Sequence, residues 1–239
     1  MQKVVWGAPS FWIERFPLYW VIDQGFFANQ GIDLEIWYAY GGPELARVVS
    51  NGRIHIGILS SGSCDDYFIR KMLSAHEIDP AGDVELIPLG EDYGKLDLFV
   101  DGRVDAAYVV EPQLARGEQE GLLRIIDRVA DYFPHYQWGI VLASEVWLQH
   151  QGELLGRLMH AFRQACRSIR DQPGRTADLG SHVFGVTPEV FKRALQRDLP
   201  RWETDARLDM AGLQSALKVQ ETMGMPTVDL WLDEMVSQL

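Results

Sequence analysis

FPLYWVIDQGFFANQGIDLEIWYAYGGPELARVVSNGRIHIGI, from Phe16 to Ile58, is the stretch that decides the fold. Pro17 stands at a predicted helix start, where its missing backbone N–H costs nothing. Ile32 to Tyr40 then alternates apolar and polar side chains, as a strand with one buried face does. A second amphipathic helix follows at 44–51 and another strand at 55–59. Strands that alternate with helices predict an α/β domain with a parallel sheet.

Four motifs in this order resemble a known family. PLYWVIDQGFFANQGIDLEIWY and GGPELARVVSNGRIHIGI are similar to the opening of type II periplasmic binding proteins of the nitrate/sulfonate/taurine and thiamine-precursor group. SSGSCDDYFIRKMLSAHEIDPAGDVELIPLG resembles the element that opens their second lobe, and DGRVDAAYVVEPQLARGEQEG resembles a later motif of that lobe. The resemblance covers most of residues 1–125. It implies a two-lobed α/β fold, in which each lobe has a central, mostly parallel sheet flanked by helices, with a helical C-terminal region.

The resemblance also sets the expected division of the chain. We expect residues 1–59 and 137–239 to form lobe one, and residues 60–136 to form lobe two. In the family several dozen residues separate the motif that ends at Leu59 from the motif that starts at Ser60, whereas here the two abut. Either this is a shortened member or a segment is absent from the sequence. A bonded junction predicts an exposed sheet edge in lobe two, or a direct connection between the lobes.

Turn residues and apolar periodicity predict the remaining elements. Helices are expected at 65–75, 95–101, 113–121, 153–171, 188–199, 210–223 and 228–238. Short strands are expected at 84–89, 105–110 and 123–127, with a return crossover at 137–144.

Composition excludes several classes of function. The 239 residues are 47% hydrophobic and 23% charged, which is typical of a globular protein, and the net charge is -12. Nucleic acid and anionic membrane surfaces attract basic proteins, so neither is an expected partner. No run of eighteen apolar residues is present to span a bilayer. The strand-like start, MQKVVWGAP, has no leader pattern, so we expect a periplasmic or cell-envelope location if a signal peptide was removed, and otherwise a cytoplasmic one.

Cysteine and histidine give no sign of a cofactor. Cys64 and Cys166 are expected to be unpaired, packed thiols. The six histidines lack metal-binding spacing, so neither a metal nor another cofactor is expected.

The candidate site follows from a rule of open α/β sheets, whose ligands bind outside the carboxyl ends of the strands. The ligand-binding candidates at these ends are Ser10, Phe11, Trp12, Tyr38, Tyr40, Gly41, Gly42, Ser60, Ser61, Gly62, Ser63, Glu111, Tyr136 and Trp138. No catalytic residue is predicted.

Each group of candidates also has a purely structural explanation. Trp12 either contacts ligand or packs on the first helix, and Tyr40-Gly41-Gly42 is either a contact or a helix-entry turn. Ser63 either caps a helix or belongs to a loop that offers backbone N–H groups to an anion. Glu111 either reaches the ligand or pairs with a buried lysine or arginine.

The chemistry of these loops is aromatic and acidic. It favours a flat, nitrogen-bearing ring that stacks and donates hydrogen bonds over a small oxyanion. With the resemblance, this predicts a monomeric solute-binding protein of an ABC-type importer, which takes a heteroaromatic solute such as a thiamine pyrimidine precursor and presents it to a membrane permease. A sulfonate, nitrate or taurine-type binding protein is the alternative ligand class.

Two further classes remain open. An enzyme on the same scaffold would be pyrimidine synthase-like, although the cysteine-rich motif of that synthase is missing, or desulfinase-like with Cys64 as its nucleophile. A cytoplasmic ligand sensor is the third class.

Overall fold

A four-stranded sheet forms the centre of the computed structural model, which describes residues 1–9, 12–39, 45, 47–49, 51, 53–54, 56–60, 64–87, 95–202, 205 and 207–224. The strand order is β2-β1-β3-β4. Strands β1 (Gln2–Pro9), β2 (Ile32–Ala39) and β3 (Ile56–Ser60) are parallel, and β4 (Gly139–Ala143) runs antiparallel to β3. The parallel α/β arrangement predicted from residues 16–58 is confirmed, and β4 lies inside the predicted return crossover.

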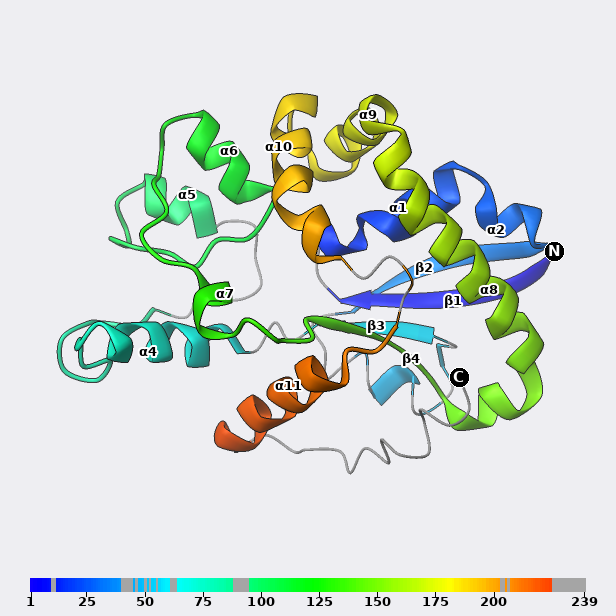
Figure 1. The fold of residues 1–239 in the computed structure, drawn as a ribbon, viewed down its shortest axis with the longest axis horizontal. Helices are drawn as coiled ribbons and strands as arrows, with labels where there is room; N and C mark the ends of the chain where they lie inside the picture. Colours follow the sequence, from blue (N-terminus) through cyan, green and yellow to red (C-terminus); the bar gives the residue numbers. More distant parts are fainter. Residues whose placement is uncertain are drawn as a thin grey trace.

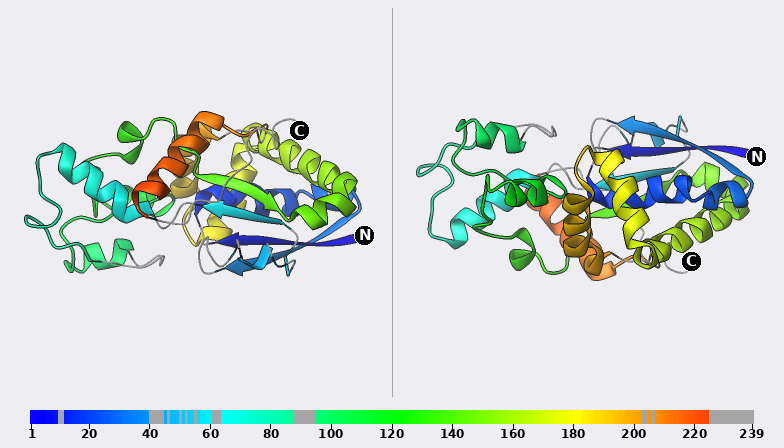
Figure 2. Two further views of the ribbon diagram at one scale, coloured as in Figure 1. Left: turned by 90° about the horizontal axis from the view of Figure 1, so that it is seen from below. Right: turned by 90° about the horizontal axis from the view of Figure 1, so that it is seen from above.

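One face of the sheet carries the main core. Val4, Trp6 and Ala8 alternate along β1 and are fully buried against helices α1 (Phe16–Asp23) and α8 (Glu145–Asp171). Pro17 lies in the first turn of α1, as predicted. The Trp20 indole N–H donates to Ser168 Oγ at 2.8 Å and joins the two helices. Figure 2 shows α1 and α8 on the same side of the sheet.

The opposite face of the sheet is covered by the second helical segment predicted from the opening stretch. Residues 45 and 47–49 are helical. Leu45, Val48 and Val49 form a buried cluster with Ile54, against which Val5 of β1 packs. Helices therefore lie on both faces of the sheet, as a doubly wound α/β fold requires.

Two helices extend the core beyond α1. Phe191 of α10 (Pro188–Asp198) lies 4.7 Å from Phe16 and 5.5 Å from Phe184, measured between ring centroids. Phe184 ends α9 (Pro173–Phe184), a helix that the sequence analysis missed because Pro173-Gly174 was interpreted as a joint. Proline is also a normal residue in the first turn of a helix, which is its position here.

The other described helices are η1 (Ile13–Arg15), α2 (Phe26–Asn29), α4 (Asp65–Ala75), α5 (Lys95–Val100), α6 (Gln113–Gln119), α7 (Val129–Tyr132), η3 (Leu199–Arg201) and α11 (Met210–Thr222). Four of them, α4, α5, α6 and α11, match predicted ranges to within two residues, whereas the short helices η1, α2, α7 and η3 were not predicted. Helix α8 starts eight residues before the predicted Glu153, because Ser144 caps it by accepting from Trp147 N–H at 3.2 Å. The predicted helix at 228–238 lies outside the described residues.

Residues 64–136 gather at one end of the molecule, with α4, α5, α6 and α7 away from the sheet (Figure 1). The strands predicted at 84–89, 105–110 and 123–127 are not found there: the described residues 84–87, 105–110 and 123–127 are not assigned to a strand. A short apolar run becomes a strand only when another strand pairs with it. Within the described part of the chain, these runs have no such partner.

The junction between the two abutting motifs lies inside a strand. Leu59 and Ser60 are consecutive in β3 and pair with Ile140 and Gly139 of β4. The junction is therefore part of the sheet, and β3 ends at Ser60.

Two other sequence-based expectations can be compared with the structure. Cys64 and Cys166 are free and buried, which confirms the prediction of packed, unpaired thiols. In the described ranges, no helix has the length and apolar character needed to cross a bilayer.

The contact between α9 and α10 provides a test of the packing. A Cβ added at Gly180 would collide with the Phe191 ring, whereas one at Gly156 on the exposed side of α8 would meet nothing within 4 Å. We expect Gly180→Ala to lower the free energy of unfolding by about 1–3 kcal/mol through overpacking. Gly156→Ala should raise it by about 0.5–1 kcal/mol, because alanine loses less backbone entropy in a helix. Urea denaturation measures the free energy of unfolding of both variants. Equal changes in the two variants would contradict the packing of Gly180 against Phe191.

Candidate functional site

Several candidates lie outside the described residues: Ser10, Phe11, Tyr40, Gly41, Gly42, Ser61, Gly62 and Ser63. Ser60 ends β3, where it is paired with Gly139. Trp12 follows β1 directly and is 9% exposed. Its carbonyl accepts from Arg15 N–H at 3.1 Å, which starts the η1 turn. The structure thus places Trp12 at the carboxyl end of the central strand, as predicted.

Tyr38 lies near the end of β2, the edge strand of the sheet, and is exposed. Its hydroxyl is 2.8 Å from that of Tyr19 on α1. This contact places Tyr38 against α1.

Tyr136 and Trp138 belong to a tightly packed group of aromatic rings. Their ring centroids are 4.9 Å apart. The ring centroid of Phe68 on α4 lies 5.2 Å from that of Tyr136 and 5.3 Å from that of Trp138. The Tyr136 hydroxyl donates to Cys64 Sγ at 3.4 Å, just before α4 begins. The two candidates are therefore brought together with the start of α4.

Glu111 is almost completely buried and both of its carboxylate oxygens are used within the protein. Arg197 Nη1 donates to Oε1 at 2.7 Å, and Ala115 N–H donates to Oε2 at 3.0 Å. Arg197 also reaches Glu118 Oε2 at 2.5 Å through Nη2. Pairing with an arginine, here the half-buried Arg197, is the structural role that the sequence left open for Glu111. Burial raises the pKa of Glu111 to about 7, although the Arg197 charge and the Ala115 amide oppose the shift.

Two carboxylates that the sequence analysis did not select lie near Glu111. Glu14 of η1 is exposed to water, yet the surrounding protein desolvates it and raises its pKa, with a further contribution from the Glu111 charge. Burial, followed by the charge of Glu14, raises the pKa of Asp198 to about 7. Within the described part of the chain, neither carboxylate forms a salt bridge.

Tyr108 connects these carboxylates with the aromatic group. It is half-buried, and burial is the main cause that raises its pKa well above the ordinary value. The charges of Asp65 and Glu14 add to the shift, as do Tyr136 and Cys64. All four groups are therefore close enough to act electrostatically on one phenol.

We call this set the convergence region: Glu14, Cys64, Asp65, Tyr108, Glu111, Tyr136 and Asp198. It joins η1, the start of α4, the chain before α6, the chain before β4 and the end of α10. The rule of strand ends could have found Glu14, which follows β1 by only five residues, but the sequence analysis did not select it. Asp198 had no local signal, because only the packing of α10 brings it here.

The donor atoms of this region do not suggest a metal site. In the described residues, no three His, Cys, Asp or Glu side chains are placed to hold an ion. Burial also raises the pKa of the Cys64 thiol, with the Tyr136 hydrogen bond opposing and the Asp65 charge adding. A thiol with a raised pKa stays protonated, whereas a nucleophilic cysteine needs its thiolate.

Comparison with solved structures shows the fold. The alkanesulfonate-binding protein SsuA from Xanthomonas axonopodis pv. citri, bound to MOPS, superposes with a TM-score of 0.73 at 12% identity, and 95% of each chain is covered. The aliphatic sulphonate binding protein SsuA from Escherichia coli gives a TM-score of 0.72 at 11% identity, covering 95% of this chain and 89% of that one.

An enzyme shares the fold as well. The desulfurization enzyme DSZB superposes with a TM-score of 0.68 at 16% identity, covering 98% of this chain and 96% of the enzyme. These superpositions show that the chain has the periplasmic-binding-protein fold. At such low sequence identity they do not decide between binding and catalysis.

Sequence comparison identifies the family. A search of curated protein sequences gives no significant match. The family model described as NMT1/THI5 like matches residues 56–176, which are 121 of the 239 residues. This segment runs from β3 to α9 and contains most of the convergence region. The chain belongs to the NMT1/THI5-like family.

Proposed function

We propose that the protein is the solute-binding component of an ABC-type importer, located in the cell envelope, and that it binds a small nitrogen-bearing ring without changing it. The observation that carries the proposal is the convergence region, where segments far apart in the sequence bring carboxylates and phenols close enough to shift one another's pKa values. We propose that these groups line one recess. The family and the fold support the class of protein.

The charge of the region supports the choice of ligand. Burial raises the pKa of both Glu14 and Asp198; the Glu111 charge adds to the shift of Glu14, and the Glu14 charge adds to the shift of Asp198. A ligand with a positive charge or several N–H donors relieves that cost, whereas a sulfonate or nitrate increases it. Tyr108 contributes an aromatic ring to the region, and stacking on such a ring favours a heteroaromatic solute. We therefore favour a solute such as a thiamine pyrimidine precursor, with sulfonates as the second candidate because of the shared SsuA fold.

The proposed mechanism is closure of two lobes around the solute. We assign residues 1–59 and 137–239 to one lobe and residues 60–136 to the other. The convergence region contains residues of both. A solute that touches both lobes stabilises the closed form by its extra affinity for that form. The closed protein then presents the solute to a membrane permease.

An enzymatic role is the alternative, since DSZB has the same fold. A desulfinase-like reaction requires an activated cysteine. Cys64 and Cys166 are both buried, and burial raises the pKa of Cys166 to about 12. Both thiols are therefore poor nucleophiles, which favours binding over catalysis.

Binding without turnover is the first expected outcome. Aminopyrimidines should raise the melting temperature in a thermal-shift screen, because a ligand of the native state stabilises it by mass action. Mass spectrometry after prolonged incubation should return the ligand unchanged. A modified product would overturn the binding role, and a shift with sulfonates alone would overturn the ligand class.

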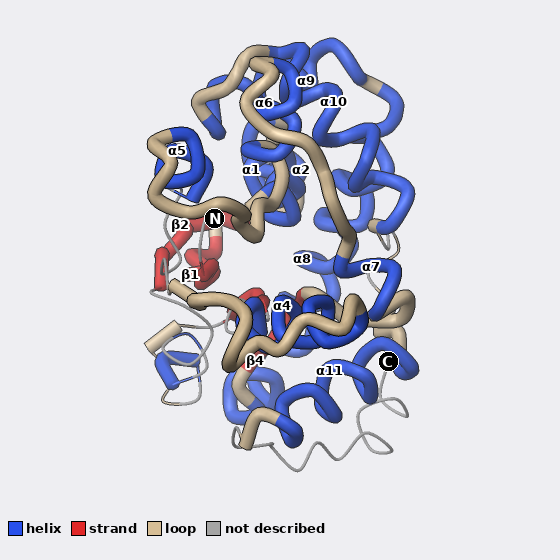
Figure 3. The backbone as a smooth tube through the Cα atoms, turned by 90° about the vertical axis from the view of Figure 1, so that its left-hand side faces the viewer, coloured by secondary structure: helices blue, strands red, loops and turns tan. Residues whose placement is uncertain are grey.

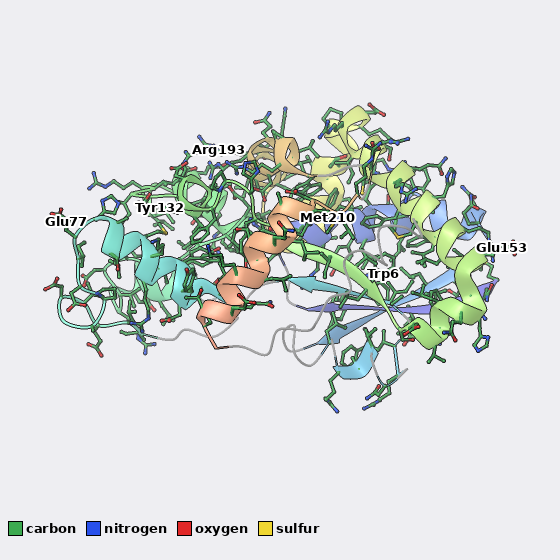
Figure 4. The ribbon with its side chains drawn as sticks, turned by 60° about the horizontal axis from the view of Figure 1, so that its bottom comes forward. Trp6, Glu77, Tyr132, Glu153, Arg193 and Met210 are labelled. Atoms are coloured by element: carbon green, nitrogen blue, oxygen red, sulfur yellow. The ribbon has the colours of Figure 1, made fainter. Side chains whose placement is uncertain are left out.

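The second prediction concerns the two carboxylates of the recess. Glu14→Gln and Asp198→Asn should each weaken binding of a cationic pyrimidine by about tenfold, the equivalent of roughly 1.4 kcal/mol, because each removes one attractive charge. Glu153→Gln is the matched control, since Glu153 lies exposed on α8 at the right-hand end of Figure 4. Isothermal titration calorimetry measures the affinity of all three variants. If Glu14→Gln and Asp198→Asn bind as tightly as the Glu153→Gln control, these two carboxylates do not belong to the site.

The third prediction is a pH dependence with a definite sign. Asp198 and Glu111 have raised pKa values of about 7, so they are mostly protonated at pH 5 and mostly ionised at pH 8. The affinity for a permanently charged N-methylpyrimidinium should therefore rise from pH 5 to pH 8. A neutral isostere should show no such rise, and Asp198→Asn should flatten the profile. Equal profiles for the charged and neutral compounds would contradict the proposal.

A further inference from the structure

Arg197 connects α10 with the segment that leads into and forms α6. One arm of its guanidinium binds Glu111 and the other binds Glu118. The Glu111 side chain is 4% exposed, while those of Arg197 and Glu118 are 22% and 25% exposed. Residues 111–118 and residue 197 fall in different lobes of the proposed division, so this contact crosses from one lobe to the other.

The contact lies away from the place where the chain itself joins the lobes. In Figures 1 and 3, α6 and α10 meet in the upper part of the molecule, whereas β3 and β4 run lower. Ser60, the last residue of β3, pairs with Gly139, the first residue of β4, so the outgoing and returning chain lie side by side. Rotation of one lobe about these connections would move apart residues that face each other far from the connections. Arg197 and its partners Glu111 and Glu118 are such residues.

We propose that Arg197 is an ionic latch that holds the two lobes of this protein closed. The inference rests on the two-lobed binding role proposed above. The latch is made by one guanidinium with two carboxylates, a geometry that suits the planar fork of arginine and not the point charge of lysine.

The energetics of burial explain why loss of Arg197 would open the protein. Arg197 lowers the pKa of the buried Glu111, so its removal leaves the closed form with either an unpaired carboxylate or a carboxyl group that must stay protonated. At pH 8 both are unfavourable relative to a carboxylate in water. In the absence of Arg197, the closed form would keep the Glu111 carboxylate buried with only the Ala115 amide as its partner. Separation of the lobes would return that carboxylate to water. Substitution should therefore shift the equilibrium toward the open form, even in protein without ligand.

The test uses spin labels and needs no ligand. Labels attached through Gln119→Cys on α6 and Lys192→Cys on α10 report the separation of the two helices, and both positions are exposed. The native Cys64 and Cys166 are buried, so the labels should react selectively at the introduced positions. In this background we expect Arg197→Met to give a longer and broader distance distribution than the parent. Arg197→Lys should recover part of the parent distribution.

Arg193→Met is the matched control, because Arg193 is an exposed arginine on the same helix (Figure 4). It should leave the distances unchanged. The double variant Arg197→Met/Glu111→Gln should return toward the parent distribution, since it removes the unpaired charge. A purely structural contact would behave differently: Arg197→Met would lower the melting temperature without altering the distances, and this result would overturn the latch.

Two precautions keep the result interpretable. If Arg197→Met does not fold, Glu118→Gln removes the more exposed of the two ion pairs of Arg197. We then expect the distance between the spin labels to lengthen in the same way but to a smaller degree. Unchanged distances in that variant would then overturn the proposal. Ligand affinity is measured separately, so a protein that opens on loss of Arg197 but binds none of the tested solutes contradicts the ligand class and not the latch.

Discussion

The double pairing of β1 is the constraint on which the rest of the molecule depends. Gln2–Pro9 is hydrogen-bonded to β2 on one side and to β3 on the other, and Trp6 sits level with Ile36 and Ile56. The Trp6 ring is fully buried and stacks on Phe162 of α8 with a centroid distance of 5.5 Å. Because β1 is fixed on both edges and by its buried face, the chain that leaves its carboxyl end has a defined position.

That position brings the chemistry of the molecule together. The chain after β1 forms η1 with Glu14, and the chain after β3 enters α4 near Cys64 and Asp65. Parallel strands end at the same edge of a sheet, so these two segments are neighbours although some fifty residues separate them. Burial raises the pKa of Glu14, Glu111 and Asp198, so each of these three carboxyl groups holds its proton more tightly than in water. Glu111 is paired with Arg197, whereas Glu14 and Asp198 feel the charges of Arg15 and of Arg201 and Arg197, respectively, without a salt bridge in the described part of the chain.

Local patterns in the sequence predicted the elements that depend on local interactions. The range of α4 was predicted to the residue, because Asp65 and Asp66 mark its first turn and Phe68 starts its apolar stripe. The alternation along Ile32–Ala39 likewise predicted β2. Trp12, Tyr136 and Glu111 were selected from strand ends and motif positions, and the resemblance predicted the family and the fold.

What the sequence could not predict depends on contacts between distant residues. Arg197 lies 86 residues from Glu111, and no pattern along α10 distinguishes it from the exposed Arg193. Asp198 reaches the recess only because Phe191 anchors α10 against Phe16. The apolar runs at 105–110 and 123–127 have the composition of strands, but strand formation requires a partner that local sequence does not specify. Cys64 was considered as a nucleophile, and only the structure shows that burial and the Asp65 charge raise the pKa of its thiol.

The pairing of Ser60 with Gly139 has a consequence for how such a molecule moves. Strands β3 and β4 are hydrogen-bonded to each other along their whole length, and β3 also pairs with β1. The last residue of β3 and the first residue of β4 are therefore held side by side in one ladder. Sliding of one strand past the other would break these hydrogen bonds, so the two ends keep one register. In the two-lobe division proposed above, both connections between the lobes would start from this fixed pair of neighbouring residues.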